Sequence, residues 1–146
     1  MQHRPDGEAE RREQKLAESQ AIKLQPRLAW IDFLLHHPGA HLVSAVVLPS
    51  RTASHLRRLH NMMNQLIEQQ NLASPFSTAI VREENILRIQ CGFADKRDAD
   101  VLARLTNARR ADLPHGWSSH RSFRLSAGKE VALAGLLTLR RFREPR

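Results

Sequence analysis

The chain has no tyrosine and a single cysteine, Cys91, among its 146 residues. The lack of tyrosine excludes nicking and strand-transfer mechanisms that use a tyrosine nucleophile. A single cysteine also excludes an internal disulfide framework. Because Cys91 alternates with apolar residues along its segment, the pattern predicts an inert, buried thiol.

Long apolar segments are missing as well. No apolar run approaches the ~20 residues that a membrane-spanning helix needs. The first residues, MQHRPDGEAERREQ, are polar and lack the apolar centre of a secretory signal. We therefore expect a cytoplasmic protein with no membrane partner.

Motifs that hold cofactors or metals are absent from the sequence. It contains no glycine-rich cofactor loop, no pair of cysteines and no HExxH segment. His55 and His60 lie five residues apart, about 140° around a helix, so they do not share a face. The acidic residues cluster at a turn tip, Glu83-Glu84, and at a helix start after Asp95, where local structure explains them. We expect no metal and no cofactor, and the sequence favours a non-catalytic protein while leaving catalysis open.

Positive charge is what the chain has in excess. The net charge is +8, and 19 of the 23 basic residues are arginine. Residues 101–146 carry ten basic and three acidic side chains, so the excess belongs mainly to the last third. The planar guanidinium group binds phosphate through paired hydrogen bonds, which suits a nucleic-acid partner. A coding bias toward arginine in a GC-rich genome would give the same composition, and the sequence alone does not separate the two explanations.

Residues 41–126 alternate between strand and helix patterns. Apolar residues at three- and four-residue spacing predict one helix that Ser50 or Thr52 caps, and a second that Asp95 caps. The helices extend to about residues 70 and 109, and strands are predicted at 41–49, across 77–93 and at 117–126. This order is that of the ferredoxin-like βαββαβ fold. We therefore expect an α+β protein with an antiparallel sheet that carries both helices on one face.

The segment 77–93, STAIVREENILRIQCGF, predicts a β-hairpin with one apolar and one polar face. A two-residue turn would pair Ile80 with Ile89. A three-residue turn would pair Val81 with Leu87 instead, and the sequence leaves both registers open.

Segments outside the βαββαβ unit predict additional helices. Residues 1–26 form a polar extension that is helical or partly disordered, and residues 27–146 form a single α+β domain with extra helices at 27–37 and 129–143. The last helix is apolar almost all round, so it requires burial on more than one side. Either the domain's own core or a second copy of the protein supplies that burial. The residues expected at such an interface are Val131, Leu133, Leu136, Leu137, Trp30 and Phe33.

Our leading functional prediction is a small basic protein that binds nucleic acid without catalysis, through arginine–phosphate contacts. RNA-recognition domains of ferredoxin-like fold stack bases on aromatic residues of their middle strands. This chain has Arg88 and Gln90 at those positions, so we expect phosphate contact rather than stacking. The expected contact residues are Arg57, Arg58, Arg88, Arg109, Arg110, Arg121, Arg124, Arg140 and Arg141.

Two alternatives belong to other classes of protein. One is a homodimeric protein–protein adaptor that uses the apolar C-terminal helix together with Trp30 and Phe33. The other is an enzyme acting on a phosphorylated substrate, which requires a pocket near His115, His120 and Arg121.

Overall fold

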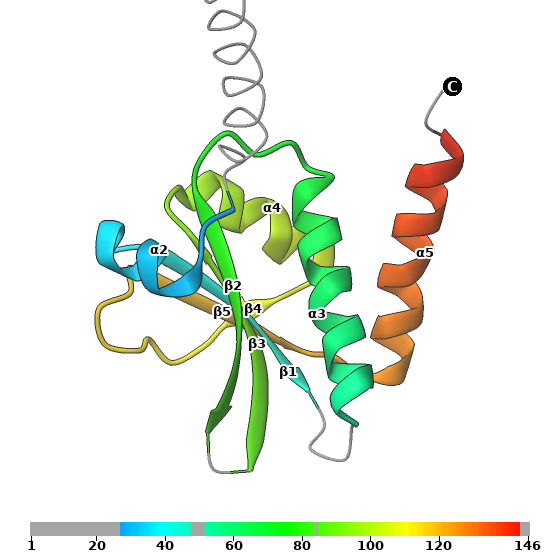
Figure 1. The fold of residues 1–146 in the computed structure, drawn as a ribbon, viewed down its shortest axis with the longest axis horizontal. Coiled ribbons are helices and arrows are strands. Elements are labelled where there is room, and N and C mark those ends of the chain that lie inside the picture. Colours follow the sequence, from blue (N-terminus) through cyan, green and yellow to red (C-terminus); the bar gives the residue numbers. More distant parts are fainter. Residues whose placement is uncertain (1–26, 48–51, 84, 144–146) are drawn as a thin grey trace, which may run out of the picture.

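The computed structural model describes residues 27–47, 52–83 and 85–143, with backbone alone for residues 138–143, so the predicted extension at 1–26 lies outside the described residues. The elements follow one another along the chain in the order α2 (Trp30–His36), β1 (His41–Val47), α3 (Ala53–Glu68), β2 (Phe76–Glu83), β3 (Ile86–Phe93), α4 (Lys96–Thr106), β4 (Arg109–Arg110), β5 (Ser119–Arg124) and α5 (Ala127–Arg143). Figure 1 shows α3 and α5 side by side on one side of the sheet and α2 on the other.

The five strands form one mixed sheet in the order β2-β3-β1-β5-β4. Strand β1 lies at the centre, antiparallel to β3 and parallel to β5, and the other pairs are antiparallel. The predicted α+β class is confirmed. The ferredoxin-like arrangement is not, because its last strand would run antiparallel to the first.

The short strand β4 is the reason for this difference. Asn107 ends α4 in the left-handed conformation, with φ of 59°, and the chain then reaches the outer edge of the sheet at Arg109 and Arg110. The loop 111–118 reverses its direction, so β5 enters between β4 and β1 and runs parallel to β1. A two-residue strand carries too little pattern to be seen in the sequence, so β4 was missed.

Local signals in the sequence place the other elements correctly. The Thr52 hydroxyl accepts a hydrogen bond from the backbone N–H of His55 at the start of α3, and Asp95 caps α4 in the same way. The hairpin has the two-residue turn, because Ile80 pairs with Ile89. Helix α2 is shorter than the predicted 27–37, since Leu28 instead donates its N–H to the carbonyl of Phe76 beside β2.

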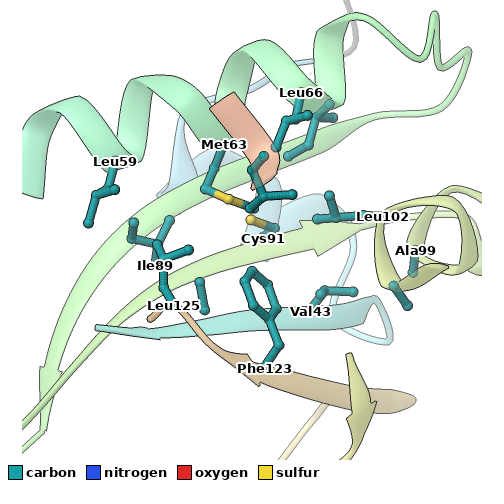
Figure 2. Close-up of a cluster of buried hydrophobic side chains, with 14 of the residues drawn as sticks. Val43, Leu59, Met63, Leu66, Ile89, Cys91, Ala99, Leu102, Phe123 and Leu125 are labelled. Atoms are coloured by element: carbon teal, nitrogen blue, oxygen red, sulfur yellow. The ribbon is translucent and has the colours of Figure 1, made fainter. Parts of the chain in front are cut away.

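The core lies between the sheet and the helices α3, α4 and α5. Side chains alternate along each strand, and the face that carries Val43, Ala45 and Val47 of β1 is packed against these helices; we call it the helix face. Figure 2 shows Met63 and Leu66 of α3, and Leu102 of α4, pointing toward Ile89, Cys91 and Phe123 of the sheet. The predicted burial of the Cys91 thiol is confirmed, and this burial raises its pKa to about 12.

On the opposite side of the sheet, which we call the open face, the described residues cover one end only. There Phe33 of α2 and Trp117 of the loop 111–118 lie over Gly92, and Trp30 stacks on Trp117 with 5.8 Å between ring centroids. A Cβ atom on Gly92 would lie 2.8 Å from a ring carbon of Phe33 and 3.0 Å from one of Trp117. Only glycine therefore allows both rings to approach the sheet this closely.

We predict that Gly92→Ala lowers the free energy of unfolding by about 1–3 kcal/mol, because the added methyl group must displace Phe33 or Trp117. Urea denaturation followed by far-UV circular dichroism measures this change. Gly135→Ala is the matched control. Gly135 lies within α5 with open space around its Cα, so alanine there should stabilise the protein by up to about 1 kcal/mol. Equal effects of the two substitutions would contradict this description of the covered end.

Candidate functional site

The uncovered end of the open face carries arginine side chains from three strands. Val46 of β1 is the register partner of Arg88 on β3 and also of Arg124 on β5. The three side chains therefore form a row across the sheet, with the two arginines on either side of Val46. Since neighbouring strands lie about 4.8 Å apart, the Cα atoms of Arg88 and Arg124 are separated by roughly 10 Å.

A third arginine, Arg109, lies in the adjacent register row, at the edge of the sheet. Arg109 of β4 pairs with Ser122 of β5, which pairs in turn with Ser44 of β1, so Arg109 lies on the same face as Arg124. Gln90 of β3 occupies the matching place on the other side of Ser44. We call the surface formed by Val46, Arg88, Gln90, Arg109, Ser122 and Arg124 the bare end; each of these residues is half-buried or exposed.

No acidic side chain of the described residues neutralises the bare end. Among the residues that the structure describes, no carboxylate forms an ion pair with Arg88, Arg109 or Arg124. The acidic residue described on this face, Glu83, is exposed at the end of β2 and forms no ion pair within the same residues. Phosphate, which forms paired hydrogen bonds with guanidinium groups, has the charge that this surface lacks.

Arg88 is the most enclosed of the three arginines. Its register neighbours are Val46 and Val81, and the side chain is half-buried. Its Nε atom is covered and finds no hydrogen-bond acceptor in the described part of the chain. A long side chain whose stem is packed in this way loses less freedom when its charged head binds a ligand.

The other predicted arginines lie elsewhere, so the nine do not form one surface. Arg57 and Arg58 are exposed on α3, on the helix side of the sheet. Arg110 and Arg121 share the helix face at the sheet edge, where Arg121 binds Asp100 at 2.5 Å. The side chains of Arg140 and Arg141 lie outside the described residues. Sequence reasoning did not separate these groups because the face of each arginine depends on strand parity and on where the helices pack.

The predicted interface residues are likewise divided. Phe33 and Leu133 are fully buried within the domain, and Leu137 packs against the core. Val131 is 73% exposed and Leu136 is 40% exposed, so only one side of the described part of α5 is covered.

Hydrogen bonds of the buried His120 connect the loop 111–118 to β1. His120 Nδ1 lies 2.6 Å from the carbonyl oxygen of Asp112 and His120 Nε2 lies 2.8 Å from Ser44 Oγ. A carbonyl can only accept, so Nδ1 carries the proton, and in the neutral ring Nε2 accepts from the Ser44 hydroxyl. These hydrogen bonds fix the loop 111–118 against β1. Sequence reasoning missed Ser44, although a serine within the otherwise apolar HLVSAVV was the available signal.

Comparison with family models, with curated proteins and with solved structures finds no match for this chain. None of the helices in the described residues is long and apolar enough to cross a bilayer. Within the same residues, no three histidine, cysteine or acidic side chains lie close enough together to hold a metal ion.

We predict that Ser44→Ala lowers the free energy of unfolding by about 1–3 kcal/mol, because it leaves Nε2 of the buried His120 without its partner. Ser122→Ala is the control, since Ser122 lies on the same strand face and its hydroxyl has no hydrogen bond within the described residues. Chemical denaturation should show a change of less than about 0.5 kcal/mol for Ser122→Ala. A neutral Ser44→Ala would show that the hydrogen bonds of His120 do not hold the loop.

Proposed function

We propose that this protein binds nucleic acid through the bare end of the open face, without catalysis and in the cytoplasm. The observation that supports this proposal is the group of Arg88, Arg109 and Arg124, which come from three strands and share one sheet face. Among the described residues, nothing covers this part of the face and none of the three has an acidic partner. Sheet faces of this kind offer a rigid, extended platform for a phosphate backbone.

The dimensions of the row suit several successive phosphates. A single strand of B-DNA advances about 3.4 Å along the helix axis per phosphate, so the ~10 Å between Arg88 and Arg124 covers roughly three. Gln90 and Ser122 lie in the adjacent row and supply neutral hydrogen-bonding groups. Both contact types are independent of base identity when they are made to the backbone, so the expected binding has weak sequence preference.

Base stacking is not part of the proposal. The positions of β3 that face outward at the bare end carry Arg88 and Gln90, and the two tryptophans pack on each other at the covered end. Affinity would therefore depend on charge, and it should fall steeply as the salt concentration rises.

A homodimeric or protein-binding adaptor is the alternative. The observation in its favour is the exposure of large apolar side chains, with Val131 of α5 at 73% and Ile31 and Leu35 of α2 at 71% and 73%. Helices α2 and α5 lie on opposite sides of the sheet (Figure 1), so these side chains do not form one patch. Light scattering that shows a dimer unaffected by salt, with no nucleic acid bound, would favour this alternative.

We predict that replacing Arg88, Arg109 and Arg124 together by glutamine weakens oligonucleotide binding at least about tenfold at low salt. The slope of log affinity against log salt should decrease by about two for a single strand, because each lost phosphate contact removes roughly 0.7 from it. Fluorescence anisotropy with a labelled oligonucleotide at several salt concentrations measures both quantities.

The matched control removes the same charge from the helix side of the protein. Arg57→Gln, Arg58→Gln and Arg104→Gln change three exposed arginines of α3 and α4 and should leave most of the slope intact. If this control loses as much of the slope as the bare-end variant, the binding surface is not the open face. If the unaltered protein shows no salt-dependent binding, the proposed function is wrong.

A further inference from the structure

A second cationic site lies at the edge of the sheet, next to Arg110, where the pairing of β4 with β5 ends. A cleft of about 390 Å³ opens there between the start of α4, the end of β4 and the loop 111–118. This volume falls within the range of small-ligand pockets. The residues that line it are Lys96, Arg110, Ala111, Leu113, Ser118, Ser119, His120 and Arg121.

The cleft carries an excess of positive charge. Lys96, Arg110 and Arg121 come from α4, β4 and β5, and one carboxylate, Asp100, faces two of them. Asp100 binds Arg121 at 2.5 Å and Lys96 at 3.7 Å. Partial burial acts to raise the pKa of Asp100, but the hydrogen bond and the charge of Arg121 outweigh it and lower the pKa. Asp100 therefore stays ionised and orients Arg121, and the sum over Lys96, Arg110, Arg121 and Asp100 is +2.

Arg110 is the group best placed to recognise a ligand. It is exposed, and within the described residues no carboxylate pairs with it. Its donors are therefore available, whereas those of Arg121 are shared with Asp100. A guanidinium group can give two parallel hydrogen bonds to one phosphate.

The other polar groups of the cleft are positioned by neighbouring elements. Ser119 Oγ lies 2.8 Å from Nδ1 of His41, and Ser118 donates its hydroxyl to the carbonyl of Gly39. The pKa of His41 is lowered, first by burial and then by the charges of Lys96 and Arg121. A neutral His41 can donate its Nδ1 proton to Ser119, which leaves the Ser119 hydroxyl proton for an anion in the cleft.

The same geometry argues against hydrolysis in this cleft. Both ring nitrogens of His120 are already bonded, one to the Asp112 carbonyl and the other to the Ser44 hydroxyl. Neither nitrogen is available as a general base for a ligand. The cleft is suited to holding an anion rather than transforming it.

We propose that this cleft binds a phosphate monoester, either the terminal phosphate of a nucleic-acid strand or that of a free mononucleotide. A monoester carries a charge of about −1.5 to −2 at neutral pH, which matches the excess in the cleft, whereas an internal phosphate diester carries only one. Because consecutive strand residues face opposite sides, Arg109 lies on the bare end and Arg110 beside the cleft. Both residues belong to the edge strand β4, so a nucleic-acid strand that leaves the bare end across this edge would bring its terminus to Arg110. This source of the phosphate rests on the proposed function.

The test compares three internally labelled oligonucleotides of one sequence, which end in a 5′-phosphate, in a 3′-phosphate or in hydroxyl groups only. In separate titrations, adenosine monophosphate and inorganic phosphate are added to the protein. Binding is measured on the full chain by fluorescence anisotropy and by calorimetry. If the cleft binds the end of a strand, we expect either the 5′-phosphorylated or the 3′-phosphorylated oligonucleotide to bind at least about tenfold more tightly than the oligonucleotide with hydroxyl ends.

The variants separate the cleft from the bare end. Arg110→Gln should abolish the preference for the phosphorylated end, whereas Arg110→Lys should keep part of it. Arg109→Gln should weaken all oligonucleotides and preserve the preference. Arg110 and Arg109 are both exposed, so neither change threatens the fold.

Each result decides a separate point. If Arg110→Gln removes a preference for a phosphorylated end, the ligand is the terminal phosphate of a strand. If the same variant removes binding of free phosphate or adenosine monophosphate, the ligand is a free mononucleotide. If no phosphorylated end is preferred and neither free ligand binds, the cleft is not a phosphate site. The proposed function is tested separately, by salt-dependent binding of the hydroxyl-ended strand.

Discussion

The close contact of Phe33 and Trp117 with Gly92 determines which part of the sheet is available for function. These two rings come from segments on either side of the βαββ unit, and both require the space that a missing side chain leaves at Gly92. They hold α2 and the loop 111–118 over one end of the open face. Since both segments are held at that end, they do not cover the polar residues at the other end of the same strands.

The reversal of the chain at the loop 111–118 follows from the same packing. Trp117 is fixed over Gly92, and His120, three residues further on, is bonded to Ser44 of β1. Strand β5 therefore starts beside the first residues of β1 and runs in the same direction, which brings Arg124 next to Val46 at the bare end. In an antiparallel arrangement the ends of this strand would be exchanged, and Arg124 would lie at the covered end.

The sequence predicted the elements better than their arrangement. The alternation of apolar and polar residues in 77–93 indicated the hairpin, and short-range chemistry indicated the caps at Thr52 and Asp95. These features depend on neighbours within a few residues, so a single sequence contains them. The parallel placement of β5 depends on contacts such as Trp117 with Gly92, which are distant in sequence and have no local signal.

The candidate site could be predicted only in part, because local patterns do not show which distant residues come together. Arg88 lies on the polar face that alternation predicts for the hairpin. The proximity of Arg88 and Arg124 to Arg109 could not be read, because it requires β4, a strand of two residues. Arg57 and Arg58 do not join them, since α3 packs on the opposite side of the sheet. Charge counts show only that one sign is in excess, whereas strand parity and helix placement decide which charges lie together.

If the bare end of the open face contacts phosphate, an added oligonucleotide should change the surroundings of its arginine side chains. The most direct measurement follows the Nε–H resonances of the arginine side chains by nuclear magnetic resonance while a single-stranded oligonucleotide is added at low salt. We expect the Nε–H signals of Arg88, Arg109 and Arg124 to shift together and those of Arg57 and Arg58 to change little. Shifts confined to the arginines of α3, with the three open-face signals unmoved, would contradict phosphate contact at the bare end.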